Sequence, residues 1–327
     1  MSMSQLPKAE LHLHLEGAAP PAFIRGLAKE KSIDLQKIFN GDGTYAYRDF
    51  AHFLTVYEAA CTVLQTPEDF YRLTQAVLEE SASHGVVYAE TFVSPDFCGG
   101  GDVVAWREYM AAMQEASEAA DRALGITLRG IVTCIRHFGP EKAKAAALCA
   151  AETRGDWLVG FGMAGDENTG QPGDYAYSFD LAREAELQLT VHAGEWRGPE
   201  EIKAALDDLR VARIGHGVRA IEDLALVDRL AEDKITLEVC PISNVTLGVY
   251  PALSAHPIEN LRAREVPVTI STDDPPFFHT TMTREYEALA QTFGWNEDDF
   301  AELNQNAMRA AFCDDETRAR VQKRFSQ

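Results

Sequence analysis

The sequence predicts an α/β protein with the (β/α)8 TIM barrel fold, carrying extra helices inserted after the first strand and at the C-terminus. Three observations favour this fold. Eight strand-like runs alternate with helical patterns, polar residues able to carry chemistry follow several of these runs, and 327 residues suit one barrel of this kind. No Pro/Gly/Ser-rich linker, repeat or low-complexity segment interrupts the pattern, so we expect residues 1–327 to form a single domain.

The expected elements follow the chain in order. Strands are expected at residues 9–17, 86–93, 126–135, 157–163, 189–193, 211–214, 235–239 and 266–270. Helices are expected at 103–124, 141–153, 175–187, 200–209, 221–232 and 258–264, with C-terminal helices over 283–325. A mainly helical insert covers about residues 20–83. In it Phe50, Phe53, Leu54 and Tyr57 recur at helical spacing, which is as typical of a core stripe as of a lid over a pocket.

Composition excludes several classes of protein. No run approaches the roughly 18 apolar residues of a membrane span, and the first residues lack the features of a signal peptide, so we expect a cytoplasmic protein that binds no membrane. The six cysteines form no Cys-X-X-Cys pair, as expected of reduced, structural thiols. The formal charge of -21 would repel nucleic acid. The sequence leaves the oligomeric state open.

The stretch from Ala9 to Gly17 alternates leucine with groups that can bind a metal. Because a strand has a period of two, His12, His14 and Glu16 share one face. An isolated His-X-His is more often a half-exposed strand than a metal site. In a barrel, however, functional residues gather at the C-terminal ends of the strands, and that is where these histidines lie.

Further candidates follow the later strands. His192 and Glu195 follow the fifth, His216 follows the sixth, and the Asp273-Asp274 pair ends the eighth. Alone, such histidines are mostly hydrogen-bonded loop residues and Asp-Asp-Pro is mostly a turn. Jointly, His12, His14, His192 and Asp273 make a plausible catalytic zinc site with room for water. The sixth strand fits less well, because the phase that turns His216 inward also turns Ile214 inward.

Motifs for other chemistries are rejected or absent. The run Gly160-Phe-Gly-Met-Ala-Gly165 has the spacing of a dinucleotide fingerprint, but the residues after it cannot open the helix that this fingerprint requires. A glycine in this run is better explained as a position where the backbone approaches a ligand closely. The sequence contains neither a Gly-X-Ser-X-Gly elbow nor a P-loop.

Six ordered motifs resemble those of the adenosine and adenine deaminases, within the amidohydrolase superfamily of metallo-dependent hydrolases. They are Pro7-Lys-Ala-Glu-Leu-His-Leu-His-Leu-Glu-Gly17, Met163-Ala-Gly-Asp-Glu167, His192-Ala-Gly-Glu195, Arg213-Ile-Gly-His-Gly217, Cys240-Pro-Ile-Ser-Asn244 and Ser271-Thr-Asp-Asp-Pro275. The resemblance covers nearly the whole chain.

The resemblance implies a role for each matched residue. His12, His14, His192 and Asp273 match the zinc ligands, and His216 matches the residue that orients and deprotonates the attacking water. Glu195 matches the acid that protonates purine N1, Asp274 the acceptor for N7, and Gly165 the backbone donor to N3. The fourth strand contains no lysine to bridge a second metal, so one zinc per chain is expected. The Cys-X-X-Cys ligand pair of cytidine deaminases is absent.

The resemblance also implies hydrolytic deamination at C6 of an aminopurine, but two departures bear on the substrate. Glu16 lies on the ligand face just beyond His14, so we expect it to bind substrate, with its carboxylate within reach of a sugar hydroxyl. Typical adenosine deaminases carry Asp at this position, and many adenine deaminases carry Glu. The segment Pro275-Pro-Phe-Phe-His-Thr-Thr281 stands where the free-base enzymes usually continue into a paired glycine and an aromatic. We expect adenosine, or a 2'-deoxy or 5'-modified adenosine, to give inosine and ammonia, with adenine to hypoxanthine as the alternative. A different amidohydrolase reaction and a metal-stabilised binding protein remain further alternatives.

Overall fold

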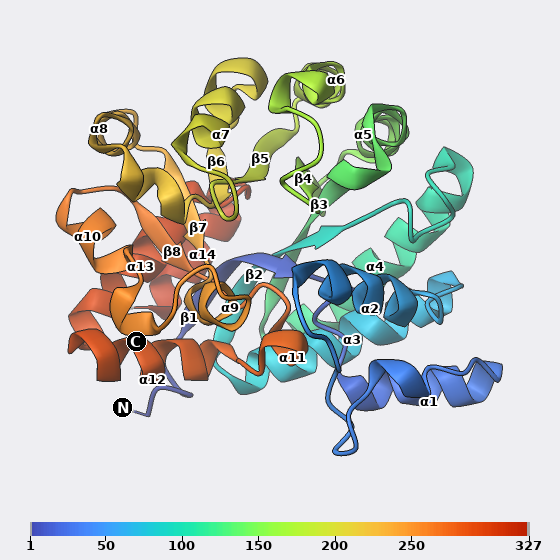
Figure 1. Ribbon diagram of the computed structural model, residues 1–327. Coiled ribbons are helices and arrows are strands. Elements are labelled where there is room, and N and C mark those ends of the chain that lie inside the picture. The colour runs from blue at the N-terminus through green and yellow to red at the C-terminus, as the bar shows by residue number, and fades with distance from the viewer. Residues whose placement is uncertain (1, 326–327) are drawn as a thin grey trace.

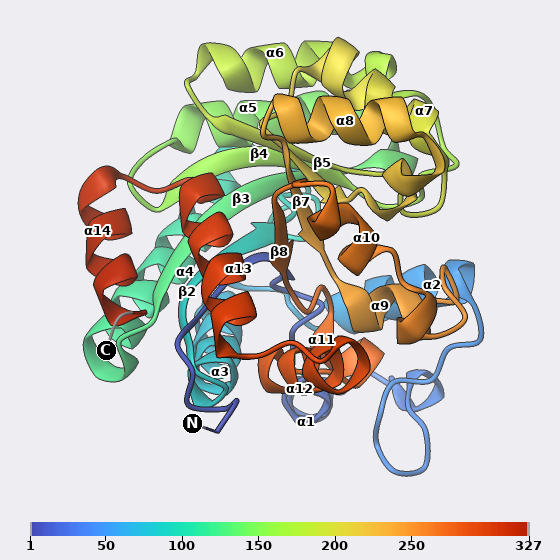
Figure 2. The ribbon, with the colours of Figure 1, turned by 90° about the vertical axis from the view of Figure 1, so that its left-hand side faces the viewer.

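The predicted (β/α)8 barrel is confirmed. The computed structural model describes residues 2–325, in which eight parallel strands form one sheet in the order β1 to β8 (Figures 1 and 2). The strands are β1 (Lys8–His14), β2 (Val86–Val93), β3 (Thr127–Ile135), β4 (Leu158–Ala164), β5 (Gln188–Ala193), β6 (Arg213–His216), β7 (Thr236–Val239) and β8 (Val268–Ile270). The barrel closes where Leu13 bridges Asp273, beyond the end of β8.

Helices form a ring around the strands (Figure 1). The α-helices are α1 (Pro21–Lys31), α2 (Phe50–Cys61), α3 (Pro67–Ser83), α4 (Val103–Leu124), α5 (Pro140–Thr153), α6 (Ala176–Glu184), α7 (Pro199–Ala204), α8 (Leu224–Glu232), α9 (Pro241–Thr246), α10 (Ile258–Ala263), α11 (Pro275–Phe278), α12 (Met282–Phe293), α13 (Glu297–Ala310) and α14 (Asp315–Arg324). Short 3-10 helices lie at Gln36–Ile38, Arg136–Phe138, Pro172–Tyr175, Val218–Glu222 and Leu253–Ala255, and a π-helical turn at Ala205–Leu209.

Both faces of the strands are buried, as a parallel sheet covered by helices requires. The β2 and α4 boundaries are those expected from the sequence, whereas β6 begins and ends two residues later than expected. The short helices α9 and α11, which follow β7 and β8, were not expected. All six cysteines are unpaired, which agrees with their structural interpretation.

The insert between β1 and β2 contains α1, α2 and α3. Asp49 is the N-cap of helix α2, and its side chain accepts a hydrogen bond from the His52 backbone N–H. Its aromatic stripe packs on α11, with the Phe53 ring 5.3 Å from that of Phe277, and also lines a cavity at the barrel mouth. The stripe therefore both packs in the core and covers the cavity. Movement of the insert as a lid stays a prediction.

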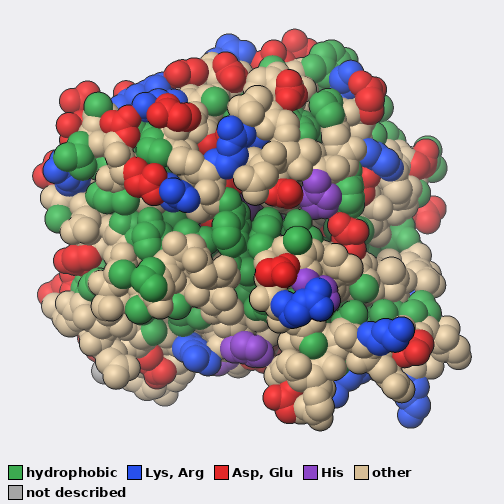
Figure 3. Space-filling model, viewed as in Figure 1, with side chains coloured by type: hydrophobic (Ala, Val, Ile, Leu, Met, Phe, Trp, Pro, Cys, Tyr) green, Lys and Arg blue, Asp and Glu red, His purple; other side chains and the backbone are tan. Residues whose placement is uncertain are grey.

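Figure 3 shows the surface of the molecule from the same side as Figure 1. Apolar side chains gather across the middle of this face, and charged side chains of both signs border them. Within residues 2–325, no helix combines the length and apolar character needed to cross a bilayer.

Candidate functional site

The four residues expected to bind metal converge at the C-terminal ends of β1, β5 and β8. The His14 Nε2 atom lies 3.1 Å from His192 Nε2 and 3.3 Å from Asp273 Oδ1, and His12 Nε2 lies 3.5 Å from the same oxygen. Ligands about 2.05 Å from a tetrahedral zinc ion are separated by roughly 3.3 Å. The observed spacings fit such an ion, and all four ligand atoms lie within 4.8 Å of one another.

The hydrogen-bond partners of His12 and His192 aim a nitrogen lone pair at this position. The Nδ1 of His192 lies 3.0 Å from the Met163 carbonyl oxygen, which can only accept, so Nδ1 carries the proton. The Nδ1 of His12 likewise donates to Glu238 Oε2 at 2.8 Å. In the neutral imidazole each Nε2 is then free of a proton, as it must be to bind a metal, and that of His12 is buried without a hydrogen-bond partner. The donor set therefore suits zinc.

Charge at the site favours a cation. Burial would raise the pKa of Asp273, but the adjacent His12 and His14 imidazoles hold that pKa well below its usual value, so the carboxylate is ionised. Burial would lower the pKa of His12, yet Asp273 and Glu238 raise it to about 9. Burial lowers the pKa of His192 well below its usual value. A metal ion placed among these groups would meet the Asp273 carboxylate, with the Glu238 carboxylate behind His12, and its binding would release the proton on His12 Nε2.

His216 reaches the site through an unusual backbone conformation. An added Cβ at Gly215 would lie 2.9 Å from His12 Cε1, so Gly215, not Ile214, faces the barrel interior on β6. Regular alternation would then point His216 outward. Its φ of +59° breaks the alternation, and its Nε2 comes within 3.8 Å of Glu195 Oε2 and 3.9 Å of Asp273 Oδ2. Asp273 also has a positive φ, +67°, and such strain is typical of functional sites.

Two further carboxyl groups face the same space. Glu195 Oε1 and Asp274 Oδ1 are buried and have no hydrogen-bond partner. Burial and the nearby charges of Asp273 and Glu167 raise the pKa of Glu195 well above its usual value. Burial and the charge of Asp273 do the same for the pKa of Asp274. The protonated form of both groups is therefore favoured, and in that form each can donate a hydrogen bond or a proton to a ligand.

A cavity of about 70 Å³ lies beside these carboxyl groups, under α2. Gly165 lines it with a φ of +102°, and an added Cβ there would lie 2.8 Å from His137 Nδ1, so only glycine fits. The lining residues are His14, Phe50, Phe53, Leu54, Tyr57, Glu58, Phe97, Ile135, His137, Ala164, Gly165, His192, Glu195, His216, Leu247, Asp273, Asp274 and Phe278. Such an apolar space with a few convergent polar groups is suited to a small planar ligand.

Glu16 lies behind this lining. It follows β1, and its carboxyl group accepts hydrogen bonds from the Ser94 backbone N–H at 3.2 Å and from the Tyr57 hydroxyl at 3.4 Å. Burial raises the pKa of Glu16 to about 7. The structure therefore places Glu16 against Tyr57, which itself lines the cavity, and not with the residues in direct contact with that space.

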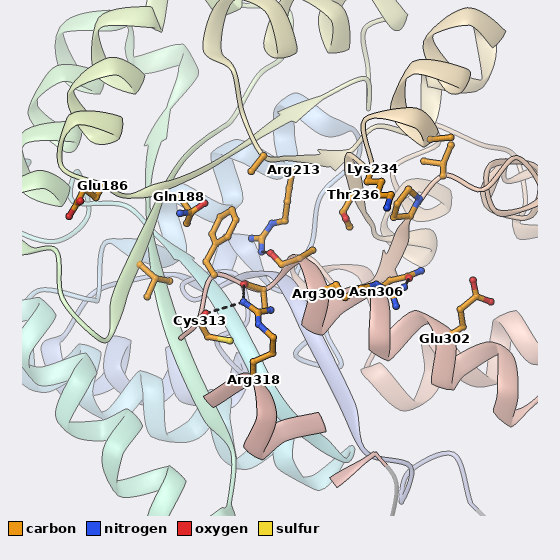
Figure 4. A pocket seen from close by; sticks show the side chains of 18 of the residues that line it. Glu186, Gln188, Arg213, Lys234, Thr236, Glu302, Asn306, Arg309, Cys313 and Arg318 are labelled. Carbon is orange, nitrogen blue, oxygen red and sulfur yellow. Dashed lines mark hydrogen bonds between the residues drawn. The ribbon is translucent and has the colours of Figure 1, made fainter. Parts of the chain in front are cut away.

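A buried polar cluster fills the barrel below the site. Glu238 accepts hydrogen bonds from Thr190 Oγ1 at 2.8 Å and Arg213 Nε at 2.6 Å, and Arg213 also pairs with Glu90 at 2.7 Å. Arg213 lies 3.5 Å over the Phe312 ring and lines a cavity of about 1080 Å³ at the opposite, N-terminal end of the strands (Figure 4). That larger cavity contains none of the expected site residues.

Sequence reasoning missed three supporting residues. Glu238 holds His12, and Ser243 donates to Asp273 Oδ2 at 2.7 Å. Glu167 accepts from the backbone N–H groups of Gly194, Trp196 and Arg197, which fixes the loop that carries Glu195. A carboxylate within the apolar run of β7 was the one signal that could have identified Glu238, because an ionisable group there needs a buried partner.

Three imidazoles and a carboxylate at the C-terminal end of a barrel define a metal-dependent hydrolase. The family model described as adenosine deaminase matches residues 7–327. The chain therefore belongs to the adenosine deaminase family, within the amidohydrolase superfamily.

Named relatives extend over nearly the whole chain. An adenine deaminase of Rhizobium rhizogenes is 47% identical over 98% of this chain and 99% of its own. The crystal structure of an adenine deaminase from Arthrobacter aurescens has a TM-score of 0.90 at 30% identity and covers 98% of both chains. An amidohydrolase from Burkhoderia ambifaria, solved with bound Zn, has a TM-score of 0.89 at 27% identity and covers 99% of this chain and 90% of its own.

Proposed function

We propose that this protein is an adenine deaminase, which hydrolyses the 6-amino group of adenine to give hypoxanthine and ammonia. Adenine is proposed as the substrate because a relative that is 47% identical over nearly its full length is an adenine deaminase. The preference for adenosine drawn from residues 275–281 is not supported, and the alternative substrate is the better supported one.

We assign His12, His14, His192 and Asp273 as ligands of one zinc ion, in agreement with the zinc bound in the amidohydrolase of similar fold. Bound zinc supplies Lewis acidity, which makes water acidic enough to act as a nucleophile at neutral pH. Glu238 contributes by holding His12 in the tautomer whose Nε2 is free to bind, and Met163 does the same for His192.

Glu195 is the acid in this proposal. Attack at C6 places negative charge on the purine ring, and a proton must reach N1 as that charge develops. The raised pKa keeps Glu195 protonated, and its orphaned Oε1 is available to the ring. Because Glu167 fixes the loop from Gly194 to Arg197, the acid is held in place before the substrate arrives.

The remaining contacts orient the base. We assign a protonated Asp274 as the donor to the N7 lone pair, in place of the acceptor role expected from the sequence, and the Gly165 backbone N–H as the donor to N3. We assign Glu16 to the support of Tyr57, and through it of α2, in place of the contact with a sugar hydroxyl expected from the sequence.

A panel of substrates tests the proposal. Adenine, adenosine, 2'-deoxyadenosine, a 5'-modified adenosine and AMP are assayed by the loss of absorbance that accompanies conversion to the 6-oxo product, with zinc-loaded and chelator-treated enzyme. We expect the highest kcat/KM for adenine, loss of turnover after chelation and recovery with zinc. A higher kcat/KM for adenosine would reject the substrate assignment. No absorbance change with any compound would instead favour another amidohydrolase reaction or a binding protein.

A further inference from the structure

A chain of hydrogen bonds connects the start of α10 to His216. The Ile258 backbone N lies 3.2 Å from His256 Nδ1, and His256 Nε2 lies 3.2 Å from Asn244 Oδ1. Asn244 Nδ2 in turn lies 3.1 Å from His216 Nδ1. His256, Asn244 and His216 are 3%, 0% and 1% exposed, so water cannot substitute for any of these partners.

The direction of every hydrogen bond in this chain follows from its first donor. A backbone N–H can only donate, so His256 Nδ1 must accept, and a neutral His256 carries its proton on Nε2. That Nε2–H donates to Asn244, which must therefore present its oxygen to His256. The amide nitrogen of Asn244 is left to face His216 Nδ1 and donates to it. A neutral His216 then carries its proton on Nε2.

The Nε2–H of His216 points into the reaction space. It lies 3.8 Å from Glu195 Oε2 and 3.9 Å from Asp273 Oδ2, too far for a hydrogen bond to either. A ligand oxygen placed between these groups is therefore its natural acceptor.

We infer that His256 and Asn244 are positioning residues, which fix the tautomer of His216 so that it donates a hydrogen bond to the oxygen that attacks the substrate. In this tautomer His216 orients that oxygen through the Nε2–H and favours its negatively charged form. The tautomer itself follows from the hydrogen bonds alone, and only the identity of the oxygen rests on the proposed function.

Nitrogen-15 NMR of histidine-labelled protein tests the inference, since the shifts of Nδ1 and Nε2 distinguish the two neutral tautomers. The His216 signals are assigned by their loss in His216→Gln, and spectra are taken with and without zinc. We expect the proton on Nε2 of His216 in the wild-type protein. A proton on Nδ1 there would overturn the inference, whether or not the enzyme deaminates adenine.

Two substitutions add a mutational test with little change in shape. Asn244→Asp replaces the amide donor with an acceptor and should transfer the His216 proton to Nδ1, whereas His256→Gln keeps a donor toward Asn244 and should leave it on Nε2. We expect kcat/KM to fall by at least about 10-fold in Asn244→Asp, with little change in KM. In a serine protease triad, a catalytic histidine held in the wrong tautomer lowers kcat by ~10⁴. His84→Gln, at a histidine bonded to Thr283, is the control that changes neither. An unchanged His216 tautomer in Asn244→Asp would overturn the inference.

Discussion

Replacing Glu238 with glutamine should weaken metal binding without any change among the four ligands themselves. The Arg213 charge outweighs burial and lowers the pKa of Glu238 to about 2, so the side chain is an ionised acceptor on both oxygens. One oxygen accepts from His12 and the other from Arg213 and Thr190. An amide cannot accept on both sides, because one of its two positions is an NH2 group.

The consequence for His12 depends on which way the new amide faces. If its oxygen faces Arg213, its NH2 group faces His12 and forces the imidazole proton onto Nε2, the atom that should bind metal. If its oxygen faces His12, the hydrogen bond survives but the negative charge that makes the imidazole more basic is lost. Loss of such an outer partner typically costs 10–100-fold in metal affinity, or about 1.4–2.7 kcal/mol.

Stability must be separated from metal binding, and Glu90→Gln provides the matched control. Glu90 is the second carboxylate of Arg213, at 2.7 Å, but it does not contact His12. Breaking a buried ion pair of this kind costs ~3–5 kcal/mol, so we expect both variants to lose comparable stability in urea unfolding of the metal-free protein. Only Glu238→Gln should lose zinc affinity, measured by competition with a fluorescent chelator. Wild-type affinity in Glu238→Gln, or an equal loss in Glu90→Gln, would refute the reasoning.

Three further predictions concern Glu195 as the acid, the backbone at Gly165 and the pH dependence of stability. Glu195→Gln should keep zinc and adenine binding, measured by calorimetry, while kcat falls by ~10²–10⁴, and near-normal turnover would contradict its role as the acid. Gly165→Ala should lower the free energy of unfolding by about 1–3 kcal/mol, because alanine is strained at a φ of +102° and its Cβ meets His137, and wild-type stability in urea would contradict this. Burial raises the pKa of Glu285 from an ordinary 4.5 to about 8, so the folded state keeps a proton that the unfolded state releases. Its contribution to stability is therefore full below about pH 4.5 and is lost as pH rises to about 8, and Glu285→Gln should flatten that part of a urea stability profile.

The fold could be predicted because its signals are local. Apolar runs and helical periodicity identified eight strands in the right order, and the rule that functional residues end the strands of a barrel identified the metal site. The weak point was β6. Its phase could not be inferred from a period of two, because His216 turns into the barrel through a positive φ while Gly215 occupies the inward position.

The sequence by itself determined the barrel, the four side chains proposed to bind metal and the family of the chain, since each depends on a residue type recurring at fixed spacing. The tertiary structure alone decided the protonation of the site. His12 meets Glu238 across 226 positions of the chain, and His216 meets Asn244 across 28. Whether an imidazole donates or accepts depends on which atom it faces in the folded interior, where no water can take the place of that partner.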